Sequence, residues 1–95
     1  MAEFTFDGKK MRNRSGQKMG ELDRDLVRAW NASRLGEIQG NNIRDVNGKK
    51  VLEFGGKVVK DDRGRKVATI EEIQKVVEGE GDIALVAMWH FFARK

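Results

Sequence analysis

The sequence predicts a mainly β protein: four to five hairpin repeats of 16 residues that form a closed or ring-like antiparallel meander, followed by a C-terminal helix and an apolar terminal segment. The first observation is the period, because segments 3–18, 19–34, 35–50 and 51–66 align without a gap and a partial fifth unit starts at residue 67. The second is glycine, which recurs at the sixth and fourteenth places of the unit. The third is the absence of proline, which leaves every backbone N–H available for strand pairing.

Each unit is expected to form two short strands and two tight turns. Apolar residues stand at its fourth and ninth places, and also at its first place from the second unit onward, and turn residues cut the unit twice. The dipeptides Asp7-Gly8 and Asn47-Gly48 favour two-residue hairpin turns. A β-solenoid with one coil per unit is the competing architecture, but two tight turns per unit favour hairpins.

The spacing also predicts a strand register. If the first turn takes the fifth and sixth places, the ninth-place Ile43 faces the second-place Gly36 of its own unit. Across the next turn Ile43 faces Leu52, and a bulge in turns such as 61–64 would shift the register by one residue. The second, fourth and ninth places then form one apolar stripe, because strand side chains alternate between faces. The opposite face carries an acidic third-place row and a basic tenth-place row, close enough for diagonal pairs: Glu21, Glu37 and Glu53 with Arg12, Arg28, Arg44 and Lys60.

The repeat stops after Ile70, and the remainder of the single domain 1–95 is expected to be a cap over residues 70–95. Thr69 and Glu72 have the spacing of a capping box, which predicts a short helix to about Glu78. Residues 79–82 then break the helix. The apolar run 83–92 is compatible with a helix or with a buried strand, and in either form we expect it to plug or cover the apolar stripe.

Charge and composition restrict the partners. The net charge of +4 makes nucleic acid and anionic surfaces candidate partners. The basic columns stand beside an acidic row, however, which indicates paired charges on a solvated face and disfavours nucleic acid. No stretch reaches the roughly 20 apolar residues of a transmembrane helix. As written, the sequence predicts a cytoplasmic protein; removal of a leader would instead place it in the cell envelope or periplasm.

The sequence contains no catalytic constellation, so we expect neither an enzyme nor a cofactor or metal site. There is no cysteine and one histidine, His90, within the apolar run. Ser15 and Ser33 fall in expected turns, which gives a Ser-His-acid triad little support. The acidic residues of 78–82 lack the spacing of a calcium loop, and Gly55-Gly56 lacks the remainder of a phosphate-binding motif.

Aromatic residues are the candidate contacts for a ligand or partner. Trp30 stands at an expected turn, where tryptophan is unfavourable unless it packs on a neighbouring hairpin or on a partner. The C-terminal run contributes Trp89, Phe91 and Phe92.

The cadence F-D-G-K-K-M-R, L-G-E-I-Q-G-N-N-I-R-D and G-K-V-V-K-D-D-R-G-R-K resembles the five-fold β-flower family of small bacterial proteins. The resemblance covers residues 3 to about 72 and implies hairpin-like petals around an axis. Family members are often made with an export signal, which implies an envelope location, but no activity or site residue carries over. The second unit departs from the pattern at Arg24-Asp25 and Ala32, where turn glycine or asparagine is expected.

These observations predict a non-catalytic binding or self-assembly module for a lipid-like ligand or a second copy of the chain. The alternative is a binder of nucleic acid or of an anionic surface that acts through the basic columns.

Overall fold

The computed structural model describes residues 3–80 and 82–93 and contains a ten-stranded sheet in the order β10-β1-β2-β3-β4-β5-β6-β7-β8-β9. From β1 to β9, consecutive strands pair in antiparallel fashion, which confirms the meander. The strands are β1 (Phe4–Phe6), β2 (Lys10–Asn13), β3 (Lys18–Asp23), β4 (Leu26–Ala29), β5 (Arg34–Gln39), β6 (Asn42–Asp45), β7 (Lys50–Gly55), β8 (Val58–Asp61), β9 (Lys66–Thr69) and β10 (Val77–Glu78).

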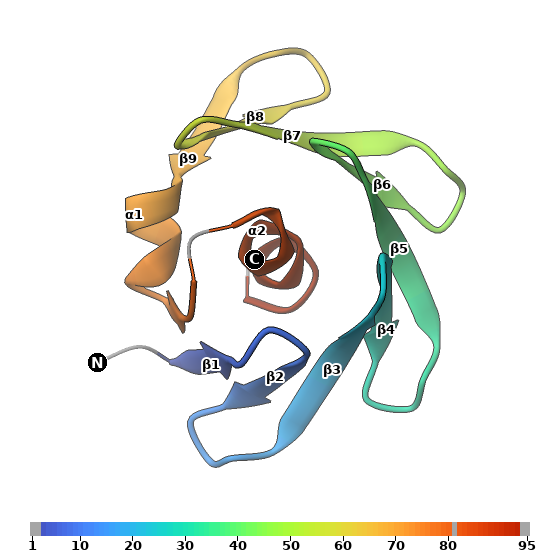
Figure 1. Cartoon of the computed structure of the whole chain (residues 1–95), viewed down its shortest axis with the longest axis vertical. Helices are drawn as coiled ribbons and strands as arrows, with labels where there is room; N and C mark the ends of the chain where they lie inside the picture. Colours follow the sequence, from blue (N-terminus) through green and yellow to red (C-terminus); the bar gives the residue numbers. More distant parts are fainter. Residues whose placement is uncertain (1–2, 81, 94–95) are drawn as a thin grey trace.

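The sheet wraps around a central helix but does not close by strand pairing. Figure 1 shows α2 (Ile83–Met88) inside the curved sheet and α1 (Ile70–Gln74) in the gap between β9 and β10. The chain leaves β9 through α1 and returns as β10, which pairs with β1 in parallel. A π-helical turn, η1 (Trp89–Ala93), extends α2 to the end of the described chain.

The first turn of each unit lies one residue later than the sequence suggested. The pair Gln39↔Asn42 brackets Gly40-Asn41, so the turn takes the sixth and seventh places. Ile43 therefore faces Ile38, and the expected pairing with Gly36 is wrong by two residues. Because side chains alternate with period two, this error leaves the same residues on the apolar face.

The second turn is a three-residue turn with a bulge, and not the expected two-residue turn at Asn47-Gly48. The N–H of Gly48 donates to the carbonyl of Asp45 (3.0 Å), the N–H of Asp45 donates to the carbonyl of Lys49 (2.9 Å), and Gly48 has a φ of 83°. This is a type I turn followed by a left-handed glycine. The expected pair Ile43↔Leu52 is confirmed, and the register then breaks before Arg44↔Lys50. The same break follows Met11, Val27 and Val59.

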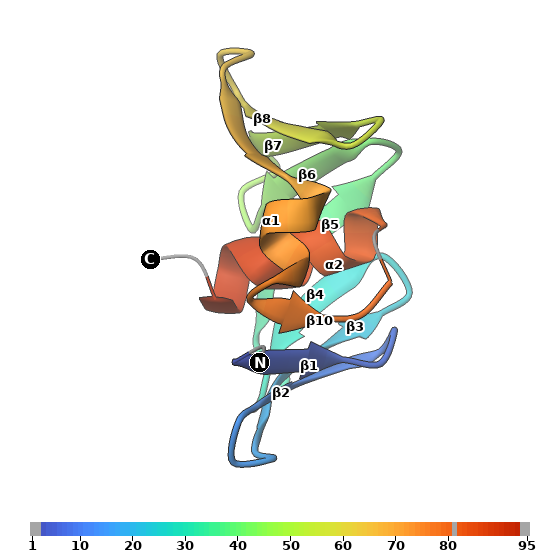
Figure 2. The same cartoon turned by 90° about the vertical axis from the view of Figure 1, so that its left-hand side faces the viewer.

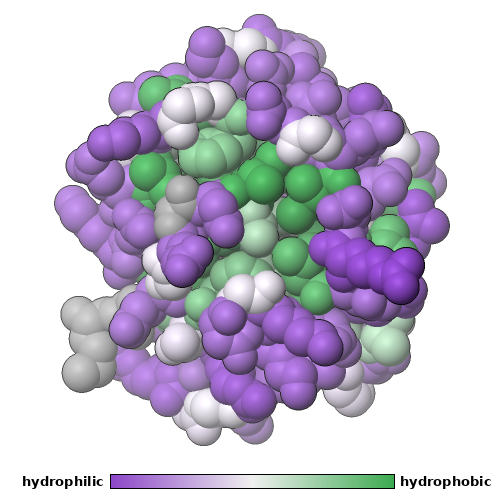
Figure 3. Space-filling view, viewed as in Figure 1, coloured by the Kyte–Doolittle hydropathy of each residue, from purple (hydrophilic) through white to green (hydrophobic). Residues whose placement is uncertain are grey.

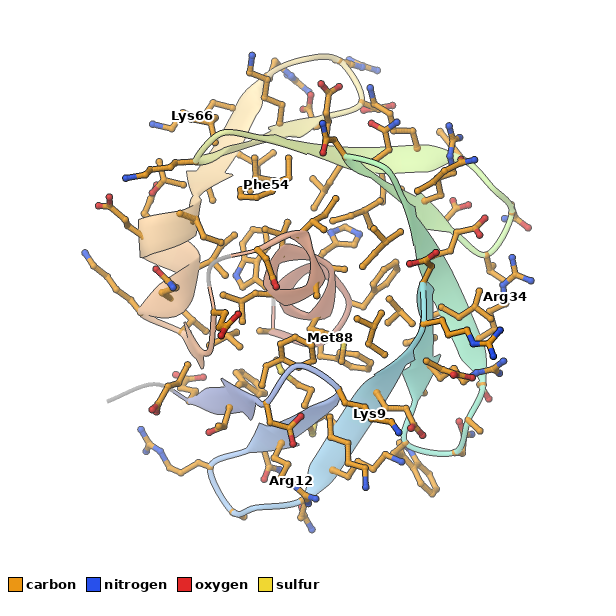
Figure 4. The ribbon with its side chains drawn as sticks, viewed as in Figure 1. Lys9, Arg12, Arg34, Phe54, Lys66 and Met88 are labelled. Carbon is orange, nitrogen blue, oxygen red and sulfur yellow. The ribbon has the colours of Figure 1, made fainter. Side chains whose placement is uncertain are left out.

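The core lies between the sheet and α2. The ninth-place residues are fully buried, as are the α2 residues that face them: Met11, Val27, Ile43 and Val59 with Leu85, Val86, Ala87 and Met88. Figure 4 shows Met88 and Phe54 inside the wrapped sheet and Arg12, Arg34 and Lys66 outside it. The expected plug is confirmed, and residues 83–92 are helical because the surrounding sheet buries a helix that is apolar on every side.

The capping box at the start of α1 is also confirmed. The Thr69 hydroxyl accepts from the N–H of Glu72 (3.2 Å), and the Glu72 carboxylate accepts from the N–H of Thr69 (3.0 Å). The helix ends at Gln74, earlier than the expected Glu78, because Val77 and Glu78 form β10 beside β1.

A meander places its turns alternately at the two ends of its strands, and the side view in Figure 2 separates them. We call the end with the β1–β2, β3–β4, β5–β6 and β7–β8 turns, where α2 also begins, the Asp7 end. The end with the β2–β3, β4–β5, β6–β7 and β8–β9 turns is the Trp30 end.

Candidate functional site

Trp30 is the most exposed large apolar side chain of the described residues. It is 70% exposed and occupies the first central position of the β4–β5 turn, so no neighbouring hairpin covers it. The turn is fixed by the N–H of Ala32, which donates to the carbonyl of Ala29 (2.9 Å), and by the N–H of Ala29, which donates to Ser33 (2.8 Å). The indole is therefore presented to solvent by a hydrogen-bonded turn.

The equivalent position of the next unit is also exposed and apolar. Val46 occupies the twelfth place, as Trp30 does, and is 53% exposed. The other two units carry exposed Arg14 and Asp62 there. Among these four turns, an exposed apolar side chain at the twelfth place is thus found only in the β4–β5 and β6–β7 turns.

The Trp30 end is also strongly basic. From the first residue of each of these turns to the end of the unit, places eleven to sixteen hold three carboxylates, Asp45, Asp61 and Asp62, and eight of the nineteen cations of the chain: Arg14, Lys18, Arg34, Lys49, Lys50, Arg63, Arg65 and Lys66. The sixteenth-place members pair with the acidic row, as in Lys18–Glu21 (2.8 Å) and Lys50–Glu53 (2.8 Å). Within the described ranges, no ion pair joins the side chains of Arg14, Lys49, Arg63 or Lys66, which leaves these cations open to a partner.

The tenth-place column instead stabilises the turns. The guanidinium groups of Arg12, Arg28 and Arg44 donate to the fourteenth-place carbonyls of their own units at 3.2, 3.1 and 2.9 Å. The fourth unit has Lys60 at this place, opposite Glu53. The acidic row lies directly opposite the tenth-place column across the strands, as in Glu21↔Arg28 and Glu37↔Arg44, but its ion pairs are with the sixteenth place.

The C-terminal aromatic residues belong to the interior. Trp89, Phe91 and Phe92 are partly buried and pack against the core. A Cβ atom on Gly20 would overlap the Phe92 ring, and one on Gly36 would overlap the Phe91 ring. The sequence did not identify these two glycines as the positions against which the aromatic rings pack. Both lie in strands at the second place of the unit, where other units carry a side chain.

The Asp7 end has the opposite electrostatic character. A cleft of about 510 Å³ lies between the β1–β2 turn and the segment that leads to α2. Its lining residues are Phe6, Asp7, Gly8, Glu78, Gly79, Glu80 and Asp82. The N–H groups of Lys10 and Lys9 donate to the Asp7 carboxylate and hold its pKa below the ordinary value, so this group is anionic at neutral pH.

The described part of the chain contains no group of three or more histidine, cysteine, aspartate or glutamate residues that could hold a metal ion. His90 contacts the edge of the Phe91 ring, with ring centroids 4.9 Å apart. None of the described helices has the length and apolar character needed to cross a membrane.

No protein-family model, curated protein or solved structure matches the chain. The function is therefore inferred from the geometry of the chain itself.

Proposed function

We propose that the protein is a non-catalytic binding module that docks an acidic macromolecular surface on its Trp30 end. The observation that carries the proposal is Trp30 itself, 70% exposed on a fixed turn at the end whose turns carry an excess of cations. A tryptophan offers a large contact area and loses little conformational entropy on binding, and such residues often dominate interface energies. The cations would guide an acidic partner to it.

A lipid-like ligand inside the sheet is less well supported. The interior that would receive it is filled by α2, whose Leu85, Val86, Ala87 and Met88 are fully buried. The basic columns are also weak candidates for nucleic-acid contacts, because three of the four side chains already donate to turn carbonyls. These considerations favour the solvent-exposed turns over the interior and over the columns.

We also propose that the units form a ring of five positions in which α1 and β10 take the last position, as in the β-flower proteins that the sequence resembles. The N–H of Phe54 donates to the carbonyl of Asn41 (2.8 Å), which links one unit to the next. The N–H of Ile70 repeats this bond with Lys57 (2.9 Å), so α1 starts where the next hairpin would start. Ring closure would then come from helix packing.

Retention on immobilised heparin, measured as the salt concentration of elution, tests the binding proposal. We expect Lys49→Glu, at the Trp30 end, to lower the elution salt more than Lys57→Glu, which makes the same change of charge at the Asp7 end. Trp30→Ala should also weaken retention, while Val76→Ala, which shortens a half-buried apolar side chain directly before β10, should not. Equal effects of the two lysine variants would show that only net charge matters and would contradict the proposal.

A further inference from the structure

We propose that the acidic partner of the Trp30 end is the Asp7 end of a second copy of this chain, so that copies associate head to tail. This inference rests on the proposed function and names its partner. The basis of the inference is that the two ends of the molecule carry opposite charges, and that each end also has an apolar element.

The charges of the Asp7 end oppose those of the Trp30 end. The turns of this end with their flanking residues and the segment 78–82 carry four cations, Lys9, Lys10, Arg24 and Lys57, against six carboxylates: Asp7, Asp23, Asp25, Glu78, Glu80 and Asp82. Four of these carboxylates line one cleft. The chain thus has an excess of anions at one end and an excess of cations at the other, and opposite patches both attract and orient a partner.

The Asp7 end also offers apolar surface to a tryptophan. Figure 3 views the molecule from this end and shows a hydrophobic centre within a hydrophilic rim. The half-buried Ile83 and Ala84 form the first turn of α2, which starts beside the cleft, and Phe6 lies in the cleft wall. A cleft of about 510 Å³ is large enough for an indole with the carboxylates around it.

The geometry of the contact determines what kind of assembly forms. The two surfaces are different parts of the chain, so the interface is heterologous, and each bound copy leaves one free end of each kind. Such association does not stop at a dimer unless the rotation closes a ring. We therefore expect the average mass to rise with protein concentration and to fall at high ionic strength.

Charge reversal at each end provides the test, with mass measured by sedimentation velocity at low ionic strength. The first variant is Arg14→Glu with Lys49→Glu and Arg63→Glu, and the second is Glu78→Lys with Glu80→Lys. Each variant alone should remain monomeric, because both of its ends then carry the same sign. An equimolar mixture should associate again, because one variant supplies acidic ends and the other supplies basic ends. Near-UV circular dichroism checks that both variants fold.

Trp30→Ala should weaken the association by roughly tenfold or more, as expected for a central interface tryptophan. Association of either reversed variant alone, or no association in the mixture, would overturn the inference. A wild-type chain that stays monomeric at every concentration also overturns it. In that case, heparin retention that still depends on Lys49 leaves the proposed function standing, and retention that does not depend on Lys49 removes both.

Discussion

Two residues of the second unit hold backbone conformations that glycine holds in other units. Arg24 has a φ of 58° where Gly40 and Gly56 have 60° and 62°, and Ala32 has a φ of 70° where Gly48 has 83°. A non-glycine residue in this left-handed region costs about 1–2 kcal/mol. Ala32→Gly should therefore raise the free energy of unfolding by about 1 kcal/mol in urea denaturation. Ala29→Gly, in the adjacent strand, is the control and should lower it. A loss of stability in Ala32→Gly would contradict this account of the turn.

Asp61 makes the β8–β9 turn sensitive to acid. Its carboxylate accepts from the N–H groups of Arg65 and Arg63, both at 2.9 Å, and these bonds hold its pKa below the ordinary value of 3.8. A lowered folded-state pKa contributes stability above the unfolded-state pKa, and the contribution is lost as the pH falls through the folded value. The free energy of unfolding should therefore decrease below about pH 4.

Asp61→Asn separates the charge from the hydrogen bonds, because an amide oxygen accepts the same two N–H groups. Asn13 already does so in the first unit, where it accepts from Ser15 and Gln17. The variant should keep its stability near neutral pH and show a shallower loss in acid when urea denaturation is repeated across the pH range. The slope should not vanish, since Asp7, Glu21, Glu53 and Glu72 also have lowered pKa values. An unchanged slope would rule out Asp61 as a contributor.

At the scale of elements, the sequence predicted which strands pair but not where each first turn falls. The pair Ile43↔Leu52 was matched correctly although the turn beside it has three residues and not two, because the register shift after Ile43 offsets the extra turn residue. The position of the first turn was not fixed by the pattern, because glycine can occupy either central residue of a two-residue turn. The cap of α1 was visible because Thr69 and Glu72 act within four residues, whereas the end of α1 depends on a distant strand, β1.

The glycines of β3 and β5 show how an element is adapted to its neighbour. Gly36→Ala would place a methyl group against the Phe91 ring and the carbonyl of Arg44, so we expect a loss of about 1–3 kcal/mol in the free energy of unfolding. Gly55→Ala is the matched control, because it is also in a strand and its Cβ would meet no atom within 4 Å. It should be neutral or slightly stabilising. Similar losses in both variants would show that strand glycine matters for a reason other than the aromatic ring.

At the scale of the whole molecule, the repeat explains the scaffold and the departures from the repeat explain the candidate site. The apolar stripe and the turns follow from patterns that recur along the chain, and the plug follows from the apolar run 83–92 that comes after the repeat. The proposed binding surface does not follow from either pattern, because it combines Trp30 from one unit with cations from several turns, which only the alternation of turns places at the same end of the strands. The exposure of Trp30 was also not predictable, because a tryptophan in a turn packs on a neighbouring element in many proteins. The sequence does not show how far the next hairpin lies from this turn.

The plug should make unfolding of the whole molecule a single event. Leu85 is fully buried between the helix and the sheet, so Leu85→Ala should lower the free energy of unfolding by about 2–5 kcal/mol. The chain has two tryptophans, one on an outer turn and one in η1. Trp89→Phe leaves Trp30 as the only fluorescent reporter of the petals, and Trp30→Phe leaves Trp89 as the reporter of the interior.

In dilute samples, both reporters should give the same urea midpoint, and Leu85→Ala should shift the two midpoints equally, because neither sheet nor helix has another core to pack against. Coincident transitions would show that the petals depend on the plug for their stability. An earlier transition at Trp89 alone would show instead that the helix leaves a sheet that stands without it. The apolar interior would then become accessible to a lipid-like ligand, because α2 would no longer fill it.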